Sequence, residues 1–134
     1  MNVFIYGTLK RGFALHDKGL SGARYSGDVQ TLKPYPLYIA ADFFGPMMLD
    51  RPGQGLRVRG ELFEIDNERL GVLDALENVG TERSFRSALD VTPVDGGMVV
   101  SAIGFFKGDN WLNPIHSGYL ADYQDRRFVP PWER

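Results

Sequence analysis

Glu77 is the side chain whose placement in this sequence most clearly predicts acid–base chemistry. It follows Leu70 and Leu73 at helical spacing, so on a helix its carboxylate continues the stripe that these two leucines bury. Burial and the negative partial charge at a helix C-terminus both disfavour an ionised carboxyl group, which prepares it for proton transfer. Alternatively, Glu77 is structural and turns toward solvent or pairs with Arg83 or Arg86. Periodicity alone leaves both interpretations open.

The loop that follows the apolar run 3–6 is a second candidate, with the sequence Gly7-Thr8-Leu9-Lys10-Arg11-Gly12. Consecutive backbone N–H groups that leave a buried strand have no ladder partner, and such groups can bind an anion. The segment is not a P-loop, because Phe13 and Ala14 stand where Lys and Ser or Thr are required. The alternative is an ordinary turn with two solvated basic residues.

Other kinds of reactive site have little support in the sequence. The chain has no cysteine, which excludes disulfides, thiolate metal sites and a Cys nucleophile. His16 and His116 have no closely spaced partner, so we expect surface histidines, no metal site and no other cofactor. There is no Gly-x-Ser-x-Gly motif of a serine hydrolase, and Gly53-Gln54-Gly55 lacks the third glycine of a dinucleotide fingerprint.

Composition limits both the size of the fold and the range of partners. A chain of 134 residues is about the size of one domain, so residues 1–134 are predicted to form a single domain. A net charge of −2 without a basic run gives no electrostatic case for binding nucleic acid or an anionic membrane. Without a leader or an apolar run of about 18 residues, the default expectation is a cytoplasmic protein.

The elements that must position the candidate residues are short strands and one main helix. Apolar and alternating runs predict strands at 3–6, 23–32, 37–40, 56–62, 85–91 and 98–106, with a hairpin turn at Asp95-Gly96-Gly97. Residues 13–20 can form a short helix, and 42–49 is expected to be an apolar loop. Asp66 can cap a helix from about Asn67 to Asn78, which Gly80 terminates. We therefore predict an α+β fold with a small curled mixed sheet or barrel.

Taken together, these segments resemble the γ-glutamylcyclotransferase superfamily over nearly the whole chain. Residues 3–12 resemble its YGTLxxG signature, residues 60–66 its central strand, and Leu73-Asp74-Ala75-Leu76-Glu77 the helix whose final Glu is the catalytic acid/base. Residues 34–40 and 49–53 are most similar to the γ-glutamylamine cyclotransferase branch. The chain departs from the family where Ser84-Phe85-Arg86 replaces the usual Tyr-x-Arg, and its loop from Asn78 to Ser84 is longer.

The resemblance implies a γ-glutamylcyclotransferase-like fold and cleavage of a γ-glutamyl amide with release of 5-oxoproline. The α-amine of such a substrate can close a five-membered ring on its own γ-carbonyl, so the enzyme need not supply a nucleophile. Glu77 would be the general acid/base, and Tyr6, Gly7, Thr8 and Leu9 would bind the α-carboxylate or the oxyanion. Two alternatives stay open: a non-catalytic module that binds a small glutamyl-like metabolite, and γ-glutamyl transfer or deprotection in a biosynthetic pathway.

The resemblance also leads to an expectation about the leaving amine. Residues 42–49 and the loop 78–84 would close that side of the pocket, with Phe43, Phe44, Met47 and Met48 as apolar walls. Such walls favour an aliphatic amine over a leaving group with a carboxylate beside the scissile bond. Arg83 would reverse this order if it entered the pocket.

Overall fold

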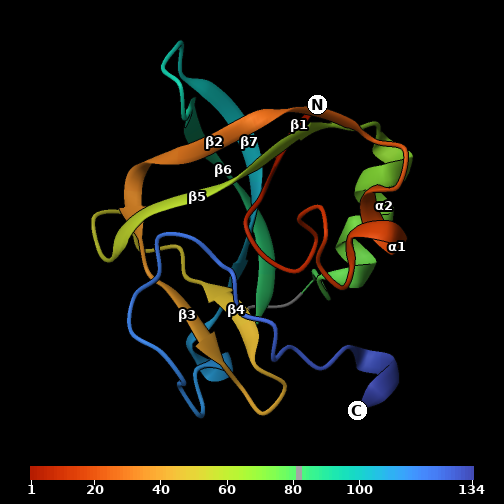
Figure 1. The fold of residues 1–134 in the computed structure, drawn as a ribbon, viewed down its shortest axis with the longest axis vertical. Helices are drawn as coiled ribbons and strands as arrows, with labels where there is room; N and C mark the ends of the chain where they lie inside the picture. Colours follow the sequence, from red (N-terminus) through yellow and green to blue (C-terminus); the bar gives the residue numbers. More distant parts are fainter. Residues whose placement is uncertain (81–82) are drawn as a thin grey trace.

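The computed structural model describes residues 1–80 and 83–134 (Figure 1), and its elements build a closed barrel with two flanking helices. The strands are β1 (Asn2–Ile5), β2 (Arg24–Tyr35), β3 (Leu37–Ala40), β4 (Gly45–Met48), β5 (Leu56–Glu64), β6 (Ser84–Pro93) and β7 (Val100–Lys107). The α-helices are α1 (His16–Leu20) and α2 (Asn67–Leu76), and the 3₁₀ turns are η1 (Asp109–Trp111) and η2 (Pro131–Glu133). The loop expected to be long, Asn78 to Ser84, lies partly outside the described residues.

The barrel is a mixed sheet with the strand order β1-β5-β2-β6-β7. β1 runs parallel to β7, whereas the other neighbouring pairs are antiparallel. β3 and β4 form a separate two-stranded sheet, which lies below the barrel in Figure 1. The predicted α+β class, with a small mixed barrel and one main helix, is therefore confirmed.

β1 is buried on both faces, as its run of apolar residues predicts. Phe4 faces one core cluster together with Val58 of β5, whereas Val3 and Ile5 face a second cluster that includes Leu73 of α2. This alternation follows from the two-residue period of a strand. β1 thus lies between the barrel interior and the helices, and the loop that follows it leaves from the boundary between the two clusters.

Helix α2 begins where the sequence predicts and ends earlier than expected. The side chain of Asp66 accepts a hydrogen bond from the backbone N–H of Arg69 at 2.8 Å, which confirms the predicted cap. The last helical residue is Leu76, and Glu77 is the C-cap residue rather than part of the last turn. The end at Asn78 was wrong because Asn78 adopts a left-handed conformation, with φ of 55°, that stops the helix.

Other boundaries also differ from the sequence prediction. The expected loop 42–49 contains strand β4, in which Pro46 pairs with Ile39. Pro46 is tolerated because a two-stranded sheet leaves one edge of each strand without a ladder partner. The helix expected at 13–20 is limited to 16–20, and the last barrel strand begins at Val100 rather than Met98, which is 85% exposed beside the hairpin turn.

The segment after β7 crosses from the barrel to the helices along the β3–β4 sheet (Figure 1). The backbone N–H of Arg59 donates to the carbonyl of Ala121 at 2.7 Å, and that of Val129 donates to Phe43 at 2.9 Å. Farther along, the Lys18 ammonium of α1 lies 4.7 Å from the centre of the Trp132 ring. Within the described ranges, neither helix has the length and apolar character needed to span a bilayer.

Candidate active site

The two candidate features of the sequence meet in one open pocket. Its lining includes Glu77 at the end of α2 and the four residues Tyr6–Leu9 that follow β1. In Figure 1 these segments lie side by side above β4. The empty space of the pocket is about 710 Å³, which includes its open mouth. The arrangement places one acidic side chain opposite a turn of backbone donors.

The loop after β1 is held through its carbonyl groups and keeps its N–H groups available. The carbonyl of Gly7 accepts from the N–H of Lys10 at 3.0 Å, and that of Thr8 accepts from Leu15 at 2.9 Å. The carbonyl of Leu9 contacts Nδ1 of His16 at 2.9 Å. The N–H groups of Gly7, Thr8 and Leu9 donate no hydrogen bond to residues 1–80 or 83–134. Fixed, unpaired donors of this kind suit an anionic group of a ligand.

The two basic residues of this loop are both paired with the protein, and the alternative of two solvated side chains was wrong for Lys10, whereas the Arg11 side chain is 49% exposed. Lys10 is 5% exposed, and its ammonium donates to the carbonyl of Tyr123 at 2.6 Å and to Asp122 at 3.1 Å. The backbone N–H of Arg11 donates to the Glu61 carboxylate at 2.8 Å, and its Nε donates to the same group at 3.0 Å. These contacts tie both ends of the turn to the barrel and the C-terminal segment.

Gly7 is required because β4 approaches the loop closely. A Cβ atom on Gly7 would lie 2.6 Å from Cγ of Pro46, which is closer than van der Waals contact allows. The β3–β4 sheet therefore packs directly against the candidate anion site, and the strand that the sequence did not predict forms part of the pocket wall.

Glu77 is held by a lysine that sequence reasoning missed. Lys107 Nζ lies 3.0 Å from Glu77 Oε2, and the two side chains are only 10% and 17% exposed. Arg86, one of the partners considered for Glu77, pairs with Asp74 instead, with Nε 3.0 Å from Oδ1. Lys107 is the last residue of an apolar strand and lies thirty residues after Glu77 in the sequence. Only the pairing of the barrel strands brings it to the helix end.

Tyr6 contributes its backbone to the pocket and keeps its phenol protonated. The hydroxyl donates to the carbonyl of Phe105 at 2.8 Å. Burial and the negative charge of Glu77 both raise the pKa of Tyr6 well above its ordinary value, while a hydrogen bond with the Met48 backbone acts in the opposite direction. The side chain is therefore neutral at physiological pH and reports how near the Glu77 charge lies.

The opposite wall of the pocket is aromatic and carries one arginine. The Phe43 ring lies edge-on to Trp111 and Phe128, with centroids 5.9 Å and 6.1 Å away, and the Arg134 guanidinium lies 3.7 Å from the Phe43 ring centre. Burial lowers the pKa of Arg134.

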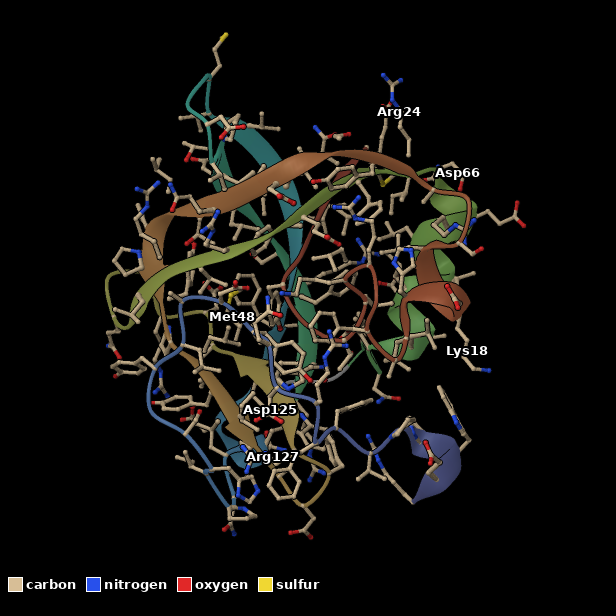
Figure 2. All side chains as sticks on the ribbon, in the orientation of Figure 1. Lys18, Arg24, Met48, Asp66, Asp125 and Arg127 are labelled. Carbon is tan, nitrogen blue, oxygen red and sulfur yellow. The ribbon has the colours of Figure 1, made fainter. Side chains whose placement is uncertain are left out.

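Of the four apolar wall residues expected from the sequence, Phe43 and Met47 line the pocket. The other two were wrong as wall residues. Met48 is fully buried in the barrel core (Figure 2), and the Phe44 ring stacks on His116 at 4.0 Å.

The two histidines are half-buried rather than on the surface. His16 contacts the carbonyl of Leu9 and His116 that of Ala41, each at 2.9 Å. Among the residues whose positions are described, no group of three or more His, Asp or Glu side chains is arranged to hold a metal ion.

The closed barrel with its flanking helices defines an α+β barrel protein, and known proteins share this fold. The crystal structure of an AIG2-like protein from Mus musculus superposes with a TM-score of 0.76 at 31% identity, covering 93% of this chain and 95% of that one. Residues 3–124 match the family described as Gamma-glutamyl cyclotransferase, AIG2-like. The chain belongs to this family.

Several relatives carry the name Gamma-glutamylaminecyclotransferase. The Mus musculus protein is 38% identical over 135 residues, which cover 98% of this chain and 82% of the relative. The Bos taurus protein is 45% identical over 80 residues, which cover 57% of this chain and 48% of the relative. In that alignment the chain spans about half the length of the relative.

Proposed function

We propose that this chain is a γ-glutamyl amide cyclotransferase, which cleaves a γ-glutamyl amine to 5-oxoproline and the free amine. The observation that carries the proposal is that Glu77 and the unpaired N–H groups of Gly7, Thr8 and Leu9 line one pocket. The names of the relatives support the same substrate class. The substrate would be a small molecule, bound with its glutamyl half against the loop after β1.

In this proposal Glu77 first acts as a base. The α-amine of the substrate has a pKa of about 8, so at neutral pH it is mostly protonated and cannot attack. The Glu77 carboxylate takes that proton, and the amine nitrogen then forms a bond to the γ-carbonyl carbon. Holding the folded-back conformer supplies the advantage of an intramolecular nucleophile. The oxyanion or the α-carboxylate accepts hydrogen bonds from the loop after β1.

Glu77 then acts as an acid. As the tetrahedral intermediate collapses, the bond between the γ-carbon and the leaving nitrogen breaks, and Glu77 returns a proton to the departing amine. The ring nitrogen still carries two hydrogens after its attack, and it gives one of them to Glu77 as the ring amide forms. Glu77 passes this second proton to the departing amine, which leaves as an ammonium ion. Two protons thus move from the α-ammonium group to the leaving amine through Glu77, and the carboxylate is restored at the end of each turnover. The reaction needs neither a nucleophile from the protein nor a cofactor, because the substrate supplies the nucleophile and Glu77 carries the protons. We therefore expect turnover to persist in the presence of a chelator.

The test is turnover of a panel of γ-glutamyl amines, γ-glutamyl peptides and γ-glutamyl amino acids, with 5-oxoproline measured as the product. Glu77→Gln keeps the shape of the side chain and removes its proton chemistry. We expect it to lower turnover by about 10²- to 10⁴-fold while the protein stays folded. Glu64→Gln is the matched control, because Glu64 lies on β5 outside the pocket and its side chain is 54% exposed.

The outcomes separate the alternatives. Near-normal turnover by Glu77→Gln would show that Glu77 is structural and that the mechanism is wrong. If the wild-type chain binds γ-glutamyl compounds but releases no 5-oxoproline from any of them, the chain is a binding module instead of an enzyme. Deprotection within a biosynthetic pathway would show as a strong preference for one larger γ-glutamyl substrate in the same panel.

A further inference from the structure

Lys107 stands at the end of β7, where its ammonium group contacts both the side chain and the backbone of Glu77. Besides the ion pair with Oε2 at 3.0 Å, Nζ donates to the carbonyl of Glu77 at 2.9 Å. It also donates to Oγ of Ser84 at 3.0 Å. Glu77 is the C-cap residue of α2, so Lys107 binds a carbonyl at the end of the helix, where the macrodipole favours a cation.

The number of acceptors around Lys107 decides what kind of role it can have. A lysine ammonium has three N–H donors. Three oxygen atoms of described residues lie within 3.0 Å of it: Glu77 Oε2, the Glu77 carbonyl and Ser84 Oγ. Two of these contacts are hydrogen bonds and the third is an ion pair, so the ammonium group is engaged by the protein on all three sides that these atoms define. Its side chain is also only 10% exposed, although it lines the pocket.

Lys107 fixes the carboxylate of Glu77 through Oε2, which lies 3.0 Å from Nζ. Glu77 also lines the pocket, so the side chain that the ion pair holds faces a ligand there. A proton-transferring carboxylate needs such a fixed rotamer at an accessible site.

We propose that Lys107 is a positioning residue for Glu77, which fixes the carboxylate toward the pocket through the ion pair to its side chain and the hydrogen bond to its backbone. Ser84 completes the arrangement by accepting from the lysine. Ser84 is 1% exposed and begins β6, so it holds the ammonium group from the buried side. The inference rests on the proposed function only in assigning proton transfer to Glu77.

The other charged or titratable groups around Glu77 come from three elements. The Tyr6 phenol follows β1, and Arg134 of the C-terminal segment lines the same pocket. Asp74, one turn earlier on α2, is already paired with Arg86. Lys107 differs from these groups because its Nζ is a cation in direct contact with the carboxylate, 3.0 Å from Oε2.

The experiment follows the ionisation of Glu77 by ¹³C NMR of side-chain carboxyl groups, with Glu77→Gln used to assign the signal. In Lys107→Met we expect the titration midpoint of Glu77 to move to higher pH by about 1 unit or more, because an adjacent cation favours the charged form. The acid limb of kcat/KM should move in the same direction, with kcat lowered about tenfold or more and KM little changed. Lys107→Arg should keep the midpoint, since it keeps the charge.

Two controls keep the inference falsifiable. Lys33→Met removes an exposed lysine and should leave the midpoint and kcat unchanged. If Lys107→Met does not fold, the wild-type chain alone can test the inference. In a pH titration, the ¹⁵N chemical shift of Lys107 Nζ should change at the same pH at which Glu77 titrates. Ser84→Ala should lower kcat less than Lys107→Met, since the ammonium group remains.

An unmoved midpoint in folded Lys107→Met, or no response of Lys107 Nζ in the wild type, would overturn the inference. These readouts need no substrate. If the midpoint moves while the wild-type chain releases no 5-oxoproline, the coupling of Lys107 to Glu77 stands and the proposed function fails.

Discussion

Tyr123 carries the one fully buried side-chain oxygen among the described residues that has no hydrogen-bond partner. Its ring is completely buried and packs against Phe13, with the centroids 5.3 Å apart, and burial raises the pKa of the phenol. A buried polar group without a partner costs about 1–3 kcal/mol. We therefore expect Tyr123→Phe to raise the free energy of unfolding by about 1 kcal/mol, measured by urea denaturation.

Tyr6→Phe is the matched comparison, because it also removes a buried hydroxyl but one that donates to Phe105. Its removal leaves the Phe105 carbonyl unpaired, so this variant should lose stability. Equal losses of stability in the two variants would mean that the hydroxyl of Tyr123 has a partner in solution, and the expectation would be wrong.

At the residue scale, the sequence predicts best what local periodicity determines. The spacing from Leu70 to Glu77 places the carboxylate at the core-facing end of a helix, and the structure puts it in the pocket. Lys107 could not be found in this way, because its contact with Glu77 depends on strand pairing between distant segments. The contacts of Lys10 could not be found in this way either. Its acceptors Asp122 and Tyr123 are more than a hundred residues away in the sequence.

At the scale of elements, α2 carries Glu77 directly after its last residue, so the start of the helix bears on the site. Asp66 caps the first turn through the backbone N–H of Arg69. Asp66→Ala removes this acceptor, and we expect it to lower the free energy of unfolding by about 1 kcal/mol, whereas Asp66→Asn keeps an acceptor and loses much less. Urea denaturation measures both values. Equal stability of Asp66→Ala and the wild type would show that the N–H of Arg69 finds another acceptor.

The elements that the sequence predicted are those with a clear period or a capping signal. β1 is a continuous apolar run, β5 shows the two-residue period of a strand, and α2 shows both a cap and a buried stripe. β4 was missed because Gly45 and Pro46 are typical of loops, and only its pairing with β3 makes it a strand. β2 continues past its expected end because a register shift between Gln30 and Pro34 lets it pair with β5 as far as Tyr35.

At the scale of the whole molecule, the C-terminal segment closes the pocket and is fixed by an ion pair of its own. Asp125 accepts hydrogen bonds from both the backbone N–H and the guanidinium of Arg127 (Figure 2), and the guanidinium lies 4.6 Å from the ring centre of Phe44. The hydrogen bond from the Arg127 side chain lowers the pKa of Asp125, against the opposing effect of burial.

This shift predicts how stability depends on pH. Because the folded pKa of Asp125 lies below its unfolded value, the pair stabilises the protein fully above the unfolded pKa of about 3.9 and loses its effect as pH falls through the folded pKa. Asp125→Asn should therefore lower Tm at neutral pH and converge with the wild type in acid. Exposed Asp95→Asn is the control. A Tm difference that persists unchanged below both pKa values would contradict this account.

The same segment and the β3–β4 sheet determine which leaving amine the pocket accepts under the proposed function. Phe43, Met47, Trp111 and Phe128 form its walls. The charge of Lys107 is matched by Glu77, and the guanidinium of Arg134 lies over the Phe43 ring. An aliphatic leaving amine therefore gains about 0.8 kcal/mol for each methylene group that it buries against these walls. This gain outweighs what a leaving group with a carboxylate beside the scissile bond can obtain by pairing that carboxylate with a cation of the pocket.

We accordingly expect a higher kcat/KM for a γ-glutamyl alkylamine than for a γ-glutamyl amino acid of equal length. Arg134→Ala is the informative variant. Two of the described residues that line the pocket are cations, and Lys107 is paired with Glu77, whereas Arg134 lies over the Phe43 ring and has no acidic partner among the described residues of the pocket. Its removal should lower kcat/KM for the amino acid more than for the alkylamine, and so widen the preference. If the wild-type chain prefers the amino acid and Arg134→Ala abolishes that preference, the arginine rather than the aromatic wall selects the leaving group.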